Sequence, residues 1–378
     1  MSQFSVPCVV YRGGTSRGLF FNEKDLPADP EQRDKIFMEG VDCYNPSQIN
    51  GLGSGTSHSS KVVVIGPASV QGAQIDYTFY QIGIGEEVVD DKGTCGNLMA
   101  AVGAYAVDEG LIDVREEAGS CTVFAYNTNI GKIIRLQVPL SRGMAKVQGA
   151  YQLSGLRKPG AKYIVDILQP GGGKLGRTLP LGPVTKLLVD DEIIEVSVVD
   201  VVNPFAYAAA ESLNLSSEEV FTDLSANGKL LARLERIRQE TSIRSGLTNN
   251  QEEAVQAPAI PKVAIVSPPM DYKTLSGMVI HKEEVDITAK MVSMGRFHRT
   301  FAGSGLYNLA AAVLLPGTVA NACSGFHVSP GEHVVRIGHP DGIAEVRVRL
   351  STDGQDVEYV GLDRTARRIM KGVLYITE

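Results

Sequence analysis

Two residues of this chain have the side chains and the surroundings needed to move a proton: Cys95 and Lys61. Cys95 stands in the stretch GTCGNLMAAVGAYAVDEG, between turn residues and just before an alanine-rich helical segment. The start of a helix presents unpaired N–H groups and a partial positive charge, which stabilise a thiolate. Lys61 ends the loop GLGSGTSHSSK and begins an apolar strand. A lysine at the end of a polar loop is usually a solvated charge, but these serines and glycines favour one that faces a site.

Glycines and hydroxyl residues surround both of these positions. The stretch YRGGTSRG follows the first predicted strand, and the cysteine is followed directly by a glycine and an asparagine. Glycine lets a ligand approach the backbone closely, and N–H groups at a helix start bind carboxylates. We therefore expect a small anion here, bound by Gly14, Thr15, Ser16, Ser60, Gly96 and Asn97.

A second helix start echoes the first after about half the chain. The stretch AGSGLYNLAAAVLLPG begins, like CGNLMAAVGAYAVDEG, with a small residue and a glycine, and continues as an alanine-rich helix. Helices that are apolar all round are buried, so the echo predicts a duplicated domain with strands wrapped round a helix in each copy. The preceding stretch MGRFHRTF supplies cations for a substrate carboxylate. The residues expected to bind substrate here are Arg296, His298, Arg299, Gly303 and Ser304.

The elements that must position these residues are mostly strands. Short β-branched runs, punctuated by glycine, proline, asparagine or aspartate, predict antiparallel strands with tight turns in both halves. A chain of 378 residues is too long for one ordinary core, so two domains are expected. We place them at 1–184 and 185–378, with a boundary in the connector PLGPVTKLLVDDE, and the last strand could return to the first domain.

Composition excludes several classes of partner. The net charge of −7 comes without a basic stretch, so nucleic acid is not expected as a partner. No apolar run reaches the ~20 residues that span a bilayer, and the sequence starts without the pattern of a signal peptide. Five cysteines without a CxxC pair indicate free thiols in a reducing cytoplasm. We therefore expect a cytoplasmic protein that binds neither nucleic acid nor membrane.

Motifs for metals and nucleotides are missing from the sequence. The six histidines show no HxH or HExxH spacing, so a metal site is not expected. Lys61 is followed by Val62, which departs from a P-loop, and no GxGxxG opens a helix after a strand. The sequence therefore offers no support for a phosphate-loop or dinucleotide site.

Several long stretches, in order from about residue 6 to residue 350, resemble the 2-methylaconitate isomerase (PrpF) family. They are YRGGTSRGLFF, GTSHSSKVVVI, CGNLMAAVGAYAV, LQPGGGKLGRTLPLG, VVDVVNPFAY, SMGRFHRTFAGSG and VRIGHPDG. The resemblance implies the diaminopimelate epimerase-like fold, of α+β class. In that fold two pseudo-symmetric domains each form a mostly antiparallel β-barrel wrapped round a central helix, with the active site in the cleft between them. The family also suggests a homodimer.

The resemblance also implies the chemistry. Amino-acid epimerases of this fold use a cysteine at each helix start, whereas this chain has Ala302 at the second. The isomerase branch is similar in having one cysteine and a lysine on the preceding strand, where Lys61 fits. The implied reaction is a cofactor-free proton shift in an unsaturated di- or tricarboxylate such as aconitate, 2-methylaconitate or oxalomesaconate. Lys61 and Cys95 are the expected catalytic residues.

Three questions stay open at the level of sequence. Either Cys95 or Lys61 could remove the proton, from a carbon between a carboxylate and a C=C bond. If the proton returns to the same carbon, the geometry of the double bond changes. If it returns to the carbon at the other end of the delocalised anion, the double bond moves. Two other functions compete with the isomerase: an amino-acid epimerase or racemase, which Ala302 disfavours, and a non-catalytic polycarboxylate-binding protein on the same fold.

Overall fold

The computed structural model describes residues 2–153, 155–293, 295–326, 329 and 331–378. It divides into two units, the first made of Met1–Leu168 with Leu362–Glu378 and the second of Gln169–Gly361. The first unit ends before the boundary expected at residue 184, and it includes the last strand. The connector after Leu168 belongs to the second unit because its backbone is bound there: the N–H groups of Lys174 and Leu175 both donate to the Asp200 carboxylate at 2.7 Å.

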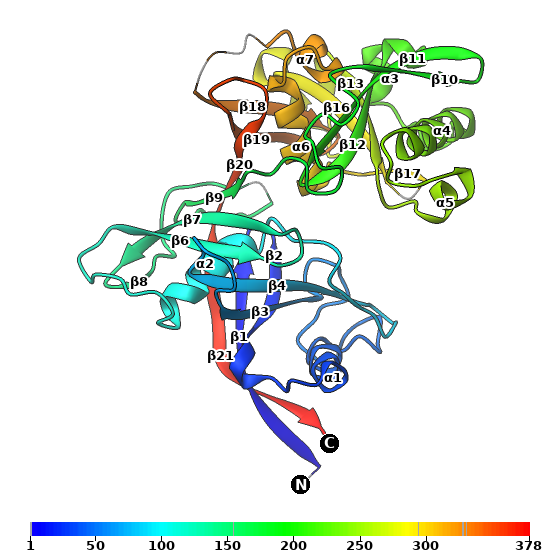
Figure 1. The fold of residues 1–378 in the computed structure, drawn as a ribbon. Helices are drawn as coiled ribbons and strands as arrows, with labels where there is room; N and C mark the ends of the chain where they lie inside the picture. The colour runs from blue at the N-terminus through cyan, green and yellow to red at the C-terminus, as the bar shows by residue number, and fades with distance from the viewer. Residues whose placement is uncertain (1, 154, 294, 327–328, 330) are drawn as a thin grey trace. The chain divides into compact units, whose positions relative to one another are not determined.

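Unit 1 is built mainly of strands (Figure 1). Antiparallel pairs join β1 to β2, β3 to β4, β6 to β7, β7 to β9 and β1 to β21, while β2–β3 and β4–β6 are parallel. Its helices are α1 (Pro30–Val41) and α2 (Met99–Asp108). Its strands are β1 (Gln3–Gly13), β2 (Ser16–Asn22), β3 (Lys61–Pro67), β4 (Ile75–Ile82), β5 (Val89–Asp90), β6 (Ser120–Asn127), β7 (Lys132–Ser141), β8 (Met144–Ala145), β9 (Tyr163–Leu168) and β21 (Ala366–Thr377).

Unit 2 contains more helix than unit 1. Its helices are α3 (Ser217–Val220), α4 (Gly228–Arg244), α5 (Gln251–Gln256), α6 (Gly303–Leu314) and α7 (Val319–Ser324). Its strands are β10 (Thr185–Val189), β11 (Glu192–Val201), β12 (Asn203–Ala209), β13 (Lys262–Ser267), β14 (Tyr272–Lys273), β15 (Val279–Ile280), β16 (Ile287–Ser293), β17 (Arg296–Phe297), β18 (Glu332–His339), β19 (Gly342–Leu350) and most of β20 (Val357–Arg364).

The strand pairings of unit 1 recur in unit 2. The antiparallel hairpin β11–β12 corresponds to β1–β2, the parallel pair β12–β13 to β2–β3, and the antiparallel pair β13–β16 to β3–β4. The parallel pair β16–β18 and the hairpin β18–β19 then repeat β4–β6 and β6–β7. The two units are therefore copies of one pattern, as the echo between the two helix starts predicted, and the expected α+β class is confirmed.

Each copy has a buried helix among its own strands. All residues of α2 from Met99 to Val107 are buried, and the helix contacts β1, β6, β7, β9 and β21. In unit 2, α6 is buried from Gly305 to Leu314 and contacts β11, β12, β18 and β19. Alanine and glycine keep these helices thin, so strands can approach them from several sides.

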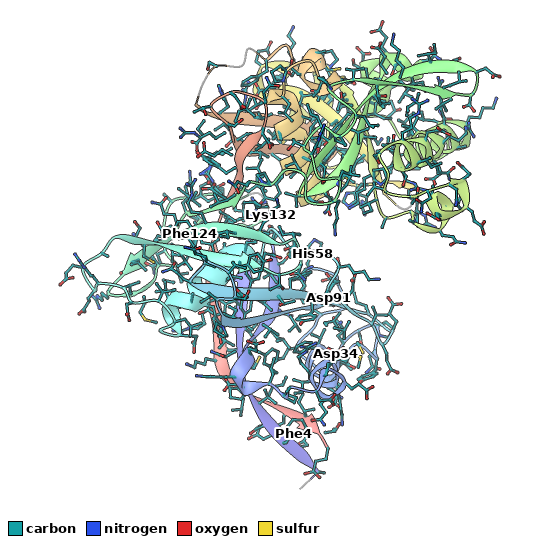
Figure 2. All side chains as sticks on the ribbon, viewed as in Figure 1. Phe4, Asp34, His58, Asp91, Phe124 and Lys132 are labelled. Carbon is teal, nitrogen blue, oxygen red and sulfur yellow. The ribbon has the colours of Figure 1, made fainter. Side chains whose placement is uncertain are left out.

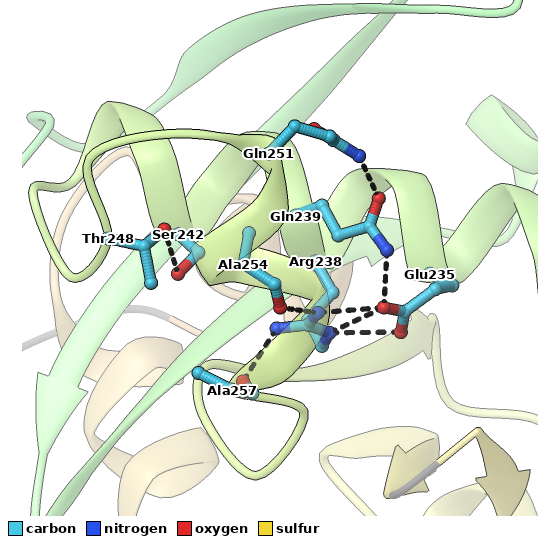
Figure 3. Close-up of polar contacts among 8 residues, drawn as sticks. All are labelled: Glu235, Arg238, Gln239, Ser242, Thr248, Gln251, Ala254 and Ala257. Atoms are coloured by element: carbon cyan, nitrogen blue, oxygen red, sulfur yellow. Dashed lines mark hydrogen bonds and ion pairs between the residues drawn. The ribbon is translucent and has the colours of Figure 1, made fainter.

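The opposite face of each sheet is covered by more polar helices. In unit 1, Ile36 and Phe37 of α1 pack on a core formed by β1 to β4. In unit 2, α4 packs on β10 and β13 and is tied to α5 by Arg238, which is 4% exposed. Its guanidinium binds the Glu235 carboxylate and the carbonyl oxygens of Ala254 and Ala257, as Figure 3 shows. This network holds the outer helices of unit 2 together.

Candidate active site

The turn between β1 and β2 lies directly against the loop that carries Cys95. Gly13 pairs with Ser16, so only Gly14 and Thr15 form the turn, and Gly14 has φ of 52°. Positive φ at the first central position of a two-residue hairpin favours glycine. A Cβ atom on Gly13 would lie 2.5 Å from the backbone oxygen of Asn97. The paired glycines of the sequence therefore allow this close approach.

Cys95 begins a turn that leads into α2. The N–H of Leu98 donates to the Cys95 carbonyl at 3.1 Å, and the helix itself begins at Met99. A turn from Cys95 to Leu98 therefore comes before the helix, which the sequence predicted to start directly after Cys95. Cys95 Sγ is partly exposed and lies 3.9 Å from the hydroxyl oxygen of Ser16. In the part of the chain that the structure describes, the N–H groups of Gly96 and Asn97 donate no hydrogen bond.

The two central helices differ from the others in how they begin. Among the described residues, α1, α3, α4, α5 and α7 each start at a side chain that accepts a hydrogen bond from the first turn. Helices α2 and α6 have Leu98 and Ala302 at that position, and neither has a side-chain cap. Unsatisfied N–H groups at a helix start need another acceptor, which a bound carboxylate can supply.

Two asparagines hold the loop before Cys95 in place. Asn127, at the end of β6, is buried and donates to the Thr94 hydroxyl at 2.7 Å and to the Tyr77 hydroxyl at 2.6 Å. Asn129 donates to the backbone oxygen of Asp91 at 2.7 Å; Figure 2 labels this aspartate. These contacts fix the loop from 91 to 94, so the position of Cys95 depends on the turn between β6 and β7.

Lys61 is 8% exposed, so it is not a solvated surface charge. Its Nζ donates to the amide oxygen of Gln81 at 2.6 Å and lies 4.9 Å from the centre of the Phe79 ring. The same Gln81 amide donates to the Ser60 carbonyl at 2.8 Å. An amide oxygen and the face of an aromatic ring are both contacts that suit an ammonium group. The side chain is therefore held in one direction by the neighbouring strand.

Strand register places Lys61 and Cys95 on the same face of the unit 1 sheet. In the parallel pair β2–β3, Leu19 is opposite Val62, so Gly18 is beside Lys61. Ser16 and Gly18 point to one face because strand side chains alternate. Ser16 meets Cys95 on that face, and a Cβ on Gly18 would lie 3.1 Å from a methyl carbon of Leu98. The turn from 95 to 98 therefore lies over the face that carries the lysine.

The other expected ligands of unit 1 are engaged with the protein. Ser60 is buried and its hydroxyl donates to the Gln48 side-chain oxygen at 2.9 Å, so it holds its own loop together. The Thr15 hydroxyl accepts from the Asn97 amide at 3.1 Å. The backbone N–H of Arg17 donates at 2.8 Å to the carbonyl of His58, which Figure 2 labels. The hairpin turn, the polar loop and the cysteine turn thus form one connected structure.

The expected residues of unit 2 lie along β17 and the start of α6. Arg296 is in β17 and Arg299 follows it; both are exposed. His298 is partly buried, and its Nδ1 accepts from the N–H and the hydroxyl of Thr300, both at 3.2 Å. Gly303 and Ser304 are the first two residues of α6. The preceding Ala302 N–H donates to the Met291 sulfur at 3.2 Å.

Sequence patterns did not identify the residues that position the site. Gln81 stands opposite Lys61 in the antiparallel pair β3–β4, at the end of the run IDYTFYQI. The register of that hairpin was the signal that could have identified it. Asn127 and Asn129, in the stretch AYNTNIGK, had the appearance of ordinary turn residues. Their partners lie far away in the sequence, so nothing local indicates their role.

Neither a metal cluster nor a membrane-spanning helix occurs in the described residues. No group of three or more His, Cys, Asp or Glu side chains among them is arranged to hold a metal ion. Within the same residues, no helix has the length and hydropathy required to cross a bilayer.

The known proteins similar to this chain match it over almost its whole length. The PrpF protein family matches residues 3–377. The 3-methylitaconate isomerase of Eubacterium barkeri is 37% identical, over 99% of this chain and 98% of that protein. The 2-methyl-aconitate isomerase of Shewanella oneidensis is 32% identical, over 99% of this chain and 97% of that protein. A crystal structure of methylitaconate-delta-isomerase superposes with a TM-score of 0.91 at 36% identity, covering 100% of this chain and 97% of the other.

Proposed function

The chain belongs to the PrpF protein family, and we infer that it is an isomerase of small unsaturated carboxylates. The observation that supports this most strongly in the site is the uncapped start of α2. It presents free N–H groups beside Cys95, on the sheet face that carries Lys61. Such a site can bind a carboxylate and exchange a proton on the adjacent carbon without a cofactor.

We propose that Lys61 and Cys95 are the two proton-handling groups, as the sequence led us to expect. Lys61 Nζ makes contacts that suit an ammonium, so we assign it as the proton donor and as the counter-charge of the thiolate. Cys95 as thiolate then removes the proton from the carbon between a carboxylate and the C=C bond. The electrons delocalise into a dienolate, and reprotonation gives the isomer. Oriented N–H groups stabilise this anion, which is often the largest catalytic contribution.

The experiment is proton NMR of candidate substrates in D₂O with purified protein. The candidates are trans-aconitate, 2-methylaconitate, oxalomesaconate and methylitaconate. We expect deuterium uptake or conversion of at least one, reduced by about 10²-fold or more in Cys95→Ser and in Lys61→Met. The matched controls are Cys121→Ser, a thiol on β6, and Lys92→Met, an exposed lysine near Cys95, which should keep full activity.

The outcomes separate this function from the two alternatives. If the wild type exchanges no proton of any candidate but still binds them, the protein is a polycarboxylate-binding protein. If it instead exchanges the α-proton of an amino acid, the epimerase hypothesis replaces ours, although Ala302 at the second helix start disfavours a two-thiol mechanism. Full activity of Cys95→Ser would overturn the assignment of the thiol while leaving the isomerase intact.

A further inference from the structure

Unit 2 contains a pocket that the proposed mechanism does not use. It has a volume of about 740 Å³ and lies beside α7, which packs on β12 and β13. Every residue that lines it belongs to unit 2. In unit 1, β6 follows α2 directly, so α7 is an addition to the duplicated pattern rather than part of it (Figure 1). A pocket of this size is typical of sites that bind small organic molecules.

The pocket lies at the far end of α6 from the residues expected to bind substrate. Gly303 and Ser304 begin this helix, whereas Gly317 and Thr318 of the pocket come just after its last residue, Leu314. A helix of 12 residues is about 18 Å long. The pocket is therefore about one helix length away from the unit 2 part of the candidate site, and it shares no residue with it.

Much of the lining is apolar. Val266 and Val319 are buried, and Leu215 is partly buried. The Ser212 hydroxyl, which also lines the pocket, donates to the Ala209 carbonyl at 2.8 Å, so it already has an acceptor within the protein. The pocket therefore offers a ligand mainly hydrocarbon surface, and burial of that surface favours binding of a molecule with an apolar body.

The charged groups of the lining all have the same sign. They are the carboxylates of Glu195 and Glu211, and the described residues that line the pocket include no lysine, arginine or histidine. Glu195 already has a cation beside it, because its carboxylate oxygen lies 3.5 Å from Lys186 Nζ. The Glu211 carboxylate is exposed and makes no hydrogen bond or ion pair with a described residue. It is therefore available to a cationic group of a ligand.

The thiol of Cys323, on α7, shows that the Glu211 carboxylate lies close to this helix. Burial, and to a smaller extent the negative charge of Glu211, raise the pKa of Cys323 to about 11. A charge raises the pKa of a thiol in this way only when the two groups are near one another. The carboxylate and the partly exposed thiol therefore belong to one pocket, and the thiol can report on a ligand bound there.

We propose that this pocket binds a small organic amine with an apolar body. Its ammonium group pairs with the Glu211 carboxylate, and its hydrocarbon part covers Val266 and Val319. Apolar burial supplies most of the affinity, while the ion pair at an exposed carboxylate contributes less and sets the preference for a cation. Two carboxylates without a cation in the lining disfavour a polycarboxylate, so the ligand of this pocket is not the substrate of the proposed isomerase.

The test compares two probes of nearly the same shape, 4-phenylbutylamine and the uncharged 4-phenylbutan-1-ol, by NMR titration. We expect the wild type to bind the amine about five-fold more tightly than the alcohol, as an ion pair at an exposed carboxylate implies. In Glu211→Gln the amine should lose this advantage while the alcohol binds as before. The matched control is Glu218→Gln, which removes an exposed carboxylate of α3 outside the lining and should keep the preference.

A second variant and a chemical label locate the bound amine. Ala322→Phe changes an exposed residue of α7 that lines the pocket, and it should weaken binding of both probes because it narrows the pocket without altering its charge. Prolonged iodoacetamide treatment at pH 9, followed by peptide mass spectrometry, measures labelling of each thiol. The amine should slow labelling of Cys323 and leave that of Cys121, a partly exposed thiol of unit 1, unchanged. Melting temperatures check that each variant is folded.

Three results would overturn the inference. The first is a folded wild type that does not bind the amine, and the second is equal binding of the amine in wild type and Glu211→Gln, because the carboxylate would then have no part in it. The third is binding that leaves the labelling of Cys323 unchanged, which would place the amine elsewhere on the protein. None of these results depends on the isomerase, since the pocket uses none of the residues that we assign to proton transfer.

Discussion

Gly13 and Asn97 approach so closely that a Cβ atom on the glycine would lie 2.5 Å from the asparagine's backbone oxygen. Ligand contact is not needed to explain this glycine: its function is to let the Cys95 turn close on the first hairpin. Gly13→Ala must displace that turn. A displacement near 1 Å in an active site can cost about 10²-fold in rate, so we expect kcat/KM to fall at least ten-fold.

The matched control for Gly13→Ala is Gly93→Ala. Gly93 stands in the loop just before Cys95, has no positive φ, and a Cβ there would meet no atom within 4 Å. Steady-state kinetics of both variants measure the effect. If Gly93→Ala loses as much activity as Gly13→Ala, the loop rather than the contact with Asn97 controls the thiol.

The hydrogen bond between Gln81 and Lys61 predicts that a substitution at Gln81 also lowers activity. Gln81→Leu removes the acceptor of Lys61 Nζ and the donor to the Ser60 carbonyl. The Lys61 side chain is then no longer held in one orientation. We expect kcat to fall about 10- to 100-fold in a folded protein. The control is Gln74→Leu: Gln74 precedes β4 and accepts from the Phe124 N–H at 2.9 Å, so this change should lower stability without lowering kcat. Equal kcat in wild type and Gln81→Leu would exclude a positioning role.

Thiol reactivity should single out Cys95. Burial raises the pKa of Cys8 to about 12 and that of Cys43 and Cys323 to about 11, and it raises the pKa of Cys121. These four groups therefore stay protonated at pH 8 and react slowly, because the thiolate is the nucleophile.

Brief treatment with iodoacetamide, followed by peptide mass spectrometry, measures which cysteine is labelled first. We expect Cys95, and we expect tricarballylate, a saturated tricarboxylate that cannot undergo the reaction, to slow its labelling. First labelling of Cys121, the other partly exposed thiol of unit 1, would contradict the prediction.

A pH effect on stability should come from His339, the last residue of β18. Burial lowers its pKa to about 4, with Asp341 opposing the shift and His298 adding to it. Its Nδ1 accepts the Asp341 N–H at 3.2 Å, which requires that nitrogen to be unprotonated. The unfolded chain gains a proton below its ordinary pKa of about 6.5, whereas the folded protein gains it only near pH 4. The stability that the neutral ring contributes is therefore lost as the pH falls from about 6.5 to about 4.

Urea unfolding at pH 7 and pH 4.5 tests this prediction in His339→Asn, where asparagine retains an acceptor. From pH 7 to pH 4.5 the wild type should lose up to about 3 kcal/mol more free energy of unfolding than the variant. His58→Asn, at an exposed histidine, should behave as the wild type. An equal loss in wild type and His339→Asn would show that another group controls the pH dependence.

Local patterns in the sequence were enough to identify the elements that carry the two proposed proton-handling residues. An alanine-rich helix without a polar face has to be buried, so the two echoing stretches predicted the duplicated fold and its central helices. The cysteine before α2 and the lysine at the start of β3 could be named because each stands where glycines and hydroxyls change to a regular apolar run. These signals depend only on residues that are neighbours in the chain.

Only the tertiary structure decided which side chains serve those residues. Gln81 meets Lys61 through strand register, Asn127 reaches Thr94 across the sheet, and the Ser60 hydroxyl donates to Gln48. Such contacts join residues far apart in the sequence, and their geometry follows from how strands pair and helices pack, which local composition does not encode.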